Sequence, residues 1–142
     1  HFWKILQALW PQHPLPSAGA DAPAYAARCN WLLARGLGLW DVYESCERAG
    51  SLDSSIRNAQ LNDFARLRGR CPRLAAIAHN GAESFKHAPA VLHSLRGSAL
   101  PQTAALPIEA VRLPSTSPAN ASWSFDRKLT AWATLLSAHG LL

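Results

Sequence analysis

The sequence predicts an α/β fold, a three-layer α/β/α sandwich built on a short parallel sheet. Stretches with helical periodicity alternate with short, continuous apolar runs, which is the pattern of β-α-β units. Each apolar run is followed by polar residues, as expected where the strands of a parallel sheet end. The chain has 142 residues, of which 49% are hydrophobic, so we expect one domain over residues 1–142.

Five segments have the residue patterns of helices. Pro11 ends the first, and Asp21 caps the second, which Gly36 closes. Asn62 caps the third. The fourth is expected to break near Pro89, because proline lacks the N–H that a helix interior needs. The predicted helices cover residues 2–10, 22–35, 62–68, 82–95 and 125–138.

Three apolar runs are predicted to be buried strands, because they are short, continuous and bounded by Gly, Pro or polar residues. They cover residues 36–43, 74–79 and 110–113. Segments with neither pattern are predicted to be loops, and they cover residues 11–19, 44–61 and 96–107. The segment 44–61 is interpreted as a long functional loop.

Polar clusters follow all three predicted strands, at residues 41–45, 79–81 and 115–120. Ligands bind beyond the carboxyl ends of parallel strands, so we expect the clusters to converge on one edge. In the last cluster, Pro114 and Pro118 stiffen a loop of hydroxyl, amide and N–H groups that suits a phosphate or a base edge. The alternative is an ordinary connection in which Ser and Asn act as turn formers and caps.

The amino-acid composition favours a phosphate-bearing partner and argues against metal-binding, disulfide-linked and membrane-spanning proteins. The net charge is +5, with 11 Arg against 3 Lys, and Arg grips phosphate bidentately, although a GC-rich genome would also raise the Arg content. The three cysteines, Cys29, Cys46 and Cys71, have no CxxC spacing, which argues against a zinc ribbon or a disulfide framework. No apolar run reaches the roughly 18 residues of a membrane span. We therefore expect a cytoplasmic protein with no membrane partner, no metal and no cofactor.

Six stretches, taken in order along the chain, resemble the uracil-DNA glycosylase superfamily, and most closely its hypoxanthine- (deoxyinosine-) DNA glycosylase and G/U mismatch-specific branch. These stretches are His1–Leu6, Gly38–Val42, Gly50–Ile56, Asn62–Phe64, Ile77–Gly81 and Leu113–Asn120. Family members carry, before the Phe-Trp pair, a first strand and a His-Pro-x-Asn segment whose Asn is implicated in catalysis. By register that Asn would immediately precede His1. A protein that begins at His1 would lack the N-terminal strand and the principal catalytic Asn, whereas a protein with further residues upstream would keep both.

The resemblance implies a monofunctional, cofactor-independent glycosylase of base-excision DNA repair, if the upstream catalytic motif is present. Such an enzyme hydrolyses the N-glycosidic bond of a deaminated base, hypoxanthine or uracil, that has been flipped out of DNA. It also implies a monomer that acts on DNA in the cytoplasm of a bacterium, associated with the nucleoid. The non-catalytic alternative is a DNA- or phosphate-binding module of the same fold. A small-molecule hydrolase with a Ser nucleophile is a third reading, but the sequence has no G-x-S-x-G motif.

The same resemblance assigns roles to individual residues. Asn80 is the catalytic candidate in this chain, and it lines the base pocket together with Phe2, Asp41 and His79. The residues expected to hold the DNA are Ser115, Thr116, Ser117, Pro118 and Asn120.

Four of these residues have structural alternatives. Asn80 could be the turn residue of Asn-Gly, and His79 a buried strand residue. Phe2 could be a core aromatic, and Asp41 a cap or the partner of an Arg.

Overall fold

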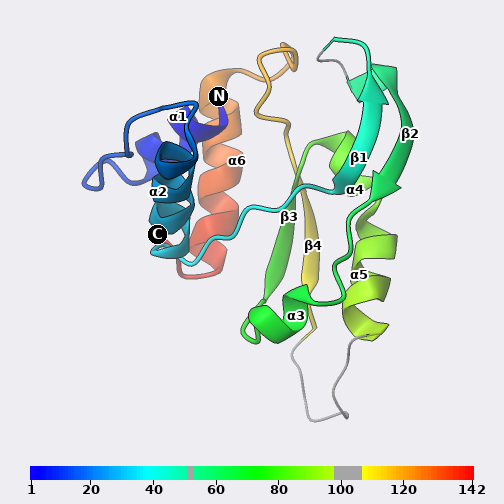
Figure 1. The fold of residues 1–142 in the computed structure, drawn as a ribbon. Coiled ribbons are helices and arrows are strands. Elements are labelled where there is room, and N and C mark those ends of the chain that lie inside the picture. The colour runs from blue at the N-terminus through cyan, green and yellow to red at the C-terminus, as the bar shows by residue number, and fades with distance from the viewer. Residues whose placement is uncertain (51–52, 98–106) are drawn as a thin grey trace. The chain divides into compact units, whose positions relative to one another are not determined.

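The computed structural model describes residues 1–50, 53–97 and 107–142 (Figure 1). The chain divides into two compact units. The first contains residues 1–40 and 116–142, and the second contains residues 41–115.

The first unit is built from three helices, α1 (Phe2–Leu9), α2 (Ala22–Leu33) and α6 (Phe125–Ala138). Ile5 and Leu6 of α1 are fully buried, and α1 packs against α6. The carboxylate of Asp21 accepts the N–H of Ala24 and so caps α2 as predicted. All three helices agree with the sequence analysis, and α6 has the predicted bounds.

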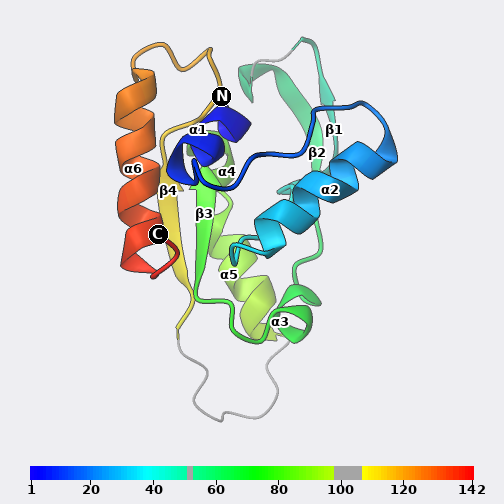
Figure 2. The same ribbon diagram turned by 90° about the vertical axis from the view of Figure 1, so that its left-hand side faces the viewer.

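The second unit holds a small parallel sheet, β3 (Ala76–Asn80) and β4 (Glu109–Leu113). Figure 2 shows the two strands side by side. The described residues of this unit also form the helices α3 (Leu67–Arg70), α4 (Ala82–Phe85) and α5 (Ala88–Gly97). Its core contains Phe64, Val91 and Leu95. The structure therefore confirms a mixed α/β fold with a small parallel sheet.

The second unit also contains an antiparallel hairpin, β1 (Tyr43–Arg48) and β2 (Ile56–Leu61), with a short 3-10 helix, η1 (Asp53–Ser55), before β2. The prediction of a loop over residues 44–61 was therefore wrong. Almost every residue of both strands is exposed, so neither carries the apolar alternation that marks a strand in a sequence.

Three other predictions need correction. Residues 36–42 form no strand, because within the described chain they have no neighbouring strand to pair with. Asn62 does not cap a helix: its Nδ2 donates to the carbonyl of Asp41, and α3 begins only at Leu67. The predicted break near Pro89 falls slightly earlier, between α4 and α5. Most of the predicted loop 96–107 lies outside the described residues.

Candidate functional site

The two parallel strands end together. Asn80, the last residue of β3, is in register with Leu113, the last residue of β4. The N–H of Gly81 then donates to the carbonyl of Leu113 over 3.0 Å. The backbone therefore fixes the end of the sheet from which the residue pair Pro114–Ser115 departs.

A glycine is required where the two strand ends meet. Gly81 has φ +103°, in the left-handed region, and a Cβ built on it would lie 3.0 Å from the Cβ of Ser115. The structure thus brings the predicted residues Asn80 and Ser115 close together in the second unit. Asn80 is exposed and Ser115 is half-buried.

His79 has a different environment from Asn80. Its side chain is 2% exposed, its Nδ1 lies 2.8 Å from Ser84 Oγ, and its ring packs edge-on against Phe85. Among the described residues its Nε2 has no hydrogen-bond partner. Burial lowers the pKa of His79, so the imidazole is neutral at pH 7. This environment fits the alternative of a buried strand residue.

The loop after Ser115 belongs to the first unit, and hydrogen bonds between its own residues stabilise it. Ser117 Oγ accepts the N–H of Ala119, and Ser117 O accepts the N–H of Asn120. Thr116 is buried, whereas Ser117 and Pro118 are exposed. Of the residues expected to hold DNA, Thr116 therefore points inward rather than toward a ligand.

Lys128 supports this loop, and sequence reasoning missed it. Its side chain is 2% exposed, and its Nζ donates to the carbonyl of Ser117 over 2.9 Å. Within the described chain, no carboxylate forms an ion pair with this ammonium. A signal was present: Lys128 precedes the buried residues Trp132 and Leu136 at intervals of four, so it lies on the apolar stripe of α6.

A second missed feature follows the loop. The guanidinium of Arg127 lies 4.3 Å from the ring centroid of Trp123, and its Nη1 donates to the carbonyl of Ser122. Ser122 Oγ in turn donates to Asn120 Oδ1 over 3.1 Å. Asn120, one of the expected DNA contacts, is therefore oriented by the start of α6.

Phe2 and Asp41 complete the predicted set. Phe2 is half-buried and packs edge-to-face on Trp3 and Trp132, at centroid distances of 5.0 and 5.7 Å. Asp41 is exposed and precedes β1 instead of ending a strand, which corrects the predicted position.

A hydrogen-bonded cluster in the second unit was not predicted. Tyr43 Oη donates to Glu83 Oε1 over 2.6 Å and lies 2.7 Å from His87 Nε2. Because Tyr43 gives its only proton to Glu83, His87 must donate through Nε2. Burial, followed by the carboxylate of Glu83, raises the pKa of Tyr43, and hydrogen bonds from Lys86 and Tyr43 lower the pKa of Glu83. The cluster ties β1 to α4 and the start of α5.

The described residues contain neither a cluster of metal ligands nor a membrane-spanning helix. No three His, Cys, Asp or Glu side chains come together as metal ligands there. Cys29, Cys46 and Cys71 are all free thiols. Every helix in that part of the chain is too short or too polar to cross a membrane.

The curated proteins that the chain resembles in sequence are DNA glycosylases. The chain is 34% identical over 105 residues to a hypoxanthine DNA glycosylase of Methanosarcina acetivorans, a match that covers 74% of the chain and 59% of the relative. A hypoxanthine DNA glycosylase of Methanosarcina barkeri is 29% identical over 90 residues, with 62% of the chain and 52% of the relative covered. The chain thus spans a little over half the length of these archaeal relatives. No family model matches the chain.

A solved structure agrees with these relatives. The solution NMR structure of a proposed uracil DNA glycosylase from Methanosarcina acetivorans matches 94% of the chain and 71% of its own length, with 29% identity and a TM-score of 0.66. The resemblance to the uracil-DNA glycosylase superfamily is confirmed. Both curated relatives are named hypoxanthine DNA glycosylases, which agrees with the branch that the sequence resembles.

Proposed function

We propose that this chain carries out base excision as a DNA glycosylase, hydrolysing the N-glycosidic bond of a flipped-out hypoxanthine or uracil. The observation that carries the proposal is the match in sequence and fold to glycosylases over most of the chain. DNA is then the substrate, and the chain needs no cofactor for the reaction. We also propose that the protein is a monomer in the cytoplasm.

Asn80 is the residue we propose for contact with the flipped base. It is exposed at the end of β3, where the backbone bond between Gly81 and Leu113 holds the strand end rigidly. Its amide offers both a donor and an acceptor, which match the edge of a purine or pyrimidine with an exocyclic oxygen. During bond cleavage negative charge builds on the departing base, and a fixed amide donor aimed at that charge lowers the barrier.

Ser115, Ser117 and Asn120 are proposed to contact DNA phosphates or sugar. Ser117 is exposed, and Asn120 is held by Ser122 and by the backbone of Ser117. Contacts of this kind set the position of the DNA without reading its sequence. Pro118 keeps its predicted role as a stiffener of the exposed turn.

The test is an excision assay. Duplex oligonucleotides with one hypoxanthine or one uracil are incubated with the protein, and abasic sites are revealed by alkaline cleavage. We expect excision by the wild-type protein that carries the upstream Asn, and at least a hundredfold slower excision when Asn80→Ala is introduced into it, because removing one positioned donor costs about 10²–10³ in rate. Asn30→Ala, on the exposed side of α2, is the matched control and should retain the wild-type rate.

The assay distinguishes a DNA glycosylase from a non-catalytic DNA-binding module of the same fold. Excision that is equal in the Asn80 and Asn30 variants would remove Asn80 from the mechanism. Salt-sensitive DNA binding with no base release from any lesion would instead support the non-catalytic DNA-binding module.

A further inference from the structure

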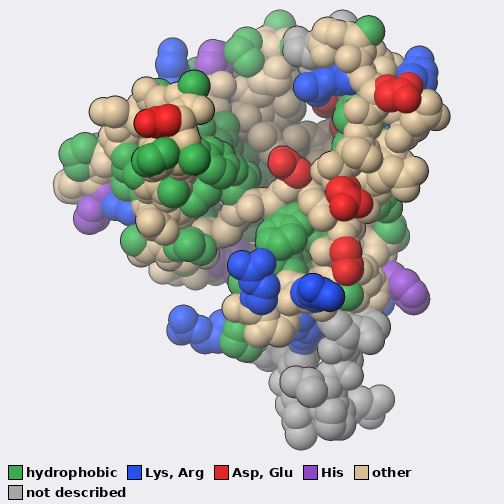
Figure 3. Space-filling view, in the orientation of Figure 1, with side chains coloured by type: hydrophobic (Ala, Val, Ile, Leu, Met, Phe, Trp, Pro, Cys, Tyr) green, Lys and Arg blue, Asp and Glu red, His purple; other side chains and the backbone are tan. Residues whose placement is uncertain are grey.

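The second unit carries a cluster of arginines around α3. The proposed function gives these arginines no role. Four arginines fall within eight residues, and no Asp or Glu occurs between residues 64 and 82. Figure 3 shows Lys and Arg side chains gathered over α3. We call this surface the arginine patch, and its members are Arg66, Arg68, Arg70 and Arg73.

The patch is mounted on a rigid segment. Phe64 is buried in the core of the second unit, and Leu67 and Leu74 pack against that core. The N–H of Cys71 donates to the carbonyl of Leu67 over 2.8 Å, and the N–H of Leu74 donates to Cys71 over 3.0 Å. Because the apolar residues of this segment are anchored inward, the arginines between them are left toward solvent.

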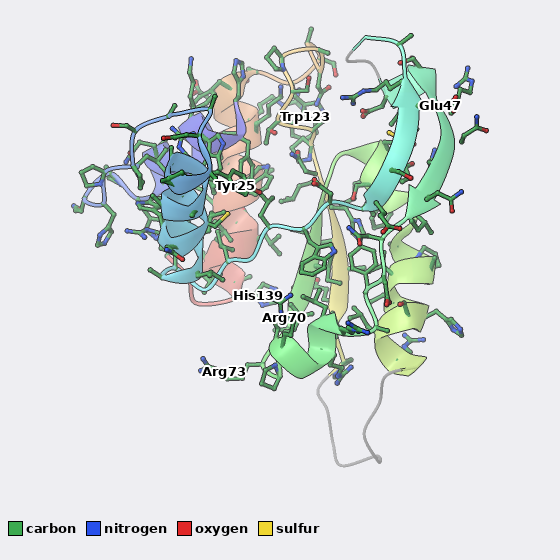
Figure 4. All side chains as sticks on the ribbon, viewed as in Figure 1. Tyr25, Glu47, Arg70, Arg73, Trp123 and His139 are labelled. Atoms are coloured by element: carbon green, nitrogen blue, oxygen red, sulfur yellow. The ribbon has the colours of Figure 1, made fainter. Side chains whose placement is uncertain are left out.

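Most of these arginines are open to solvent. Arg66, Arg70 and Arg73 are exposed, and Arg68 is half-buried. Figure 4 shows Arg70 on α3 and Arg73 on the turn that follows it. Among the described residues, Arg66, Arg68 and Arg73 form no ion pair. Like charges gathered within eight residues of chain repel one another, so a polyanion that binds them relieves that repulsion.

The chemistry of the patch favours phosphodiester over a protein partner. A guanidinium forms two parallel hydrogen bonds with a phosphate, and several fixed in one patch suit a repeating phosphate chain. Protein interfaces are centred on buried aromatic or aliphatic anchors. No large hydrophobic side chain between residues 62 and 82 is exposed, so this surface offers no such anchor to a protein partner.

The patch is separate from the end of the sheet where Asn80 lies. Arg73 comes three residues before β3, and Asn80 is the last residue of that strand. A five-residue strand is about 13 Å long from first to last Cα at a rise of about 3.3 Å per residue. A base bound at Asn80 therefore cannot reach the patch.

We propose that the arginine patch is a second, sequence-independent DNA contact that holds the phosphodiester backbone away from the base-excision end. The choice of DNA among polyanions rests on the proposed function. The patch supplies affinity for undamaged DNA, and excision itself does not depend on it.

The test uses a lesion-free 30-base-pair duplex with a fluorescent label, titrated with the protein at several salt concentrations. The patch variant replaces Arg66, Arg68 and Arg73 with Gln. The matched control removes the same charge elsewhere in the second unit, with Arg48, Arg96 and Arg112 replaced by Gln, all of them exposed. A third variant, with Lys at the three patch positions, keeps the charge but loses the bidentate geometry.

We expect the patch variant to bind at least tenfold more weakly at low salt, with the slope of log K against log salt reduced by about 2 to 3, since each lost phosphate contact removes about 0.9. The control should lose less than threefold, and the Lys variant should fall between. Melting curves of all variants should coincide with that of the wild type. Single-turnover excision at saturating protein should be unchanged by the patch substitutions.

Three results would overturn the proposal. Equal losses in the patch and control variants would mean that only net charge matters. An unchanged Kd for the patch variant would remove the patch from DNA binding. Patch-dependent binding of an RNA hairpin or of phosphatidylserine vesicles, with DNA binding unaffected, would assign it another partner. If no lesion is excised but undamaged DNA still needs the patch, the proposed function fails and the patch stands.

Discussion

Adjacent residues at the end of β3 meet opposite environments. His79 is buried and neutral, while Asn80 is exposed, as the alternation of side chains along a strand requires. Gly81 then allows the chain to pass close to Ser115. Each of these three residues has a distinct physical role, so each substitution should have a distinct signature.

Gly81→Ala should destabilise the protein by about 2–3 kcal/mol. About 1–2 kcal/mol comes from a positive φ in a residue with a Cβ, and the rest from the contact with Ser115. Gly140→Ala is the control, because Gly140 also has a positive φ but a Cβ there meets nothing within 4 Å. Urea unfolding measures both. Equal losses would show that the approach of Ser115 costs nothing.

Lys128→Met should separate folding from DNA binding. A buried ammonium with one neutral partner is costly to desolvate, so an apolar side chain of similar length should leave stability unchanged or raise it by about 1 kcal/mol. DNA affinity should fall by about tenfold, because the loop at Ser117 loses its support and a nearby positive charge. Urea unfolding and fluorescence anisotropy measure the two effects.

Lys128→Arg is the companion variant, since it keeps both the charge and a donor, and it should restore most of the affinity. A loss of more than about 3 kcal/mol in the Met variant would contradict the expectation, because it is the loss typical of breaking a strongly paired buried charge.

At the scale of elements, the hairpin β1–β2 depends on contacts from outside itself. Its strands are largely exposed, so little apolar burial holds them in place. The bonds from Tyr43 to Glu83 and His87 tie β1 to α4 and to the start of α5. The hairpin should therefore respond to the loss of one hydroxyl more strongly than a strand buried in a core.

Tyr43→Phe should lower the free energy of unfolding by about 1–2 kcal/mol, since it leaves Glu83 and His87 without their shared partner. Amide hydrogen exchange should become faster across residues 43–48 and 56–61, while β3 and β4 keep their protection. Ser45→Ala, which removes an exposed hydroxyl from the same strand β1, is the control. Uniformly faster exchange over both sheets would show that the bond acts on the whole unit and not on the hairpin.

For the molecule as a whole, the shifted groups predict how stability changes with pH. The pKa of His79 is lowered from 6.5 and that of Glu83 from 4.5, so their contributions are present above those values and are lost as the pH falls below them. The pKa of Tyr43 is raised above 10.0, so its contribution is present below pH 10 and is lost as the pH rises further. Unfolding free energies should therefore decline on both sides of a plateau.

The decline between pH 6.5 and 5 should be smaller in His79→Gln, measured by urea unfolding at each pH. His93→Gln, on the exposed side of α5, should keep the wild-type profile. An identical acid limb in both variants would assign that limb to other groups.

The parts of this fold that were predictable are those with a local signal. Asp21 and Ser124 cap helices whose apolar residues recur at helical spacing, and the apolar runs of β3 and β4 are continuous. Residues 36–42 carry the same kind of run, but a strand also needs a neighbour, and Leu39 and Trp40 are exposed. The apolar content of a segment does not show whether a neighbouring strand is available for it to pair with.

The candidate site was predictable to a similar extent. Asn80 and Ser115 lie at strand ends, a position that the alternation of elements made visible. The bond from Tyr43 to Glu83 joins residues 40 apart, and no local pattern reports it. Lys128 was overlooked because a lysine in a helix is normally solvated, whereas here its position on the apolar stripe decided its environment.

The backbone hydrogen bond from Gly81 to Leu113 affects how such proteins can diversify. Main-chain atoms, together with one glycine, determine the geometry of the end of the sheet. Side chains at this end of the sheet can therefore be exchanged in evolution or by design without removing the hydrogen bond that shapes it. New base preferences could be selected on this scaffold without first acquiring compensating stabilising mutations.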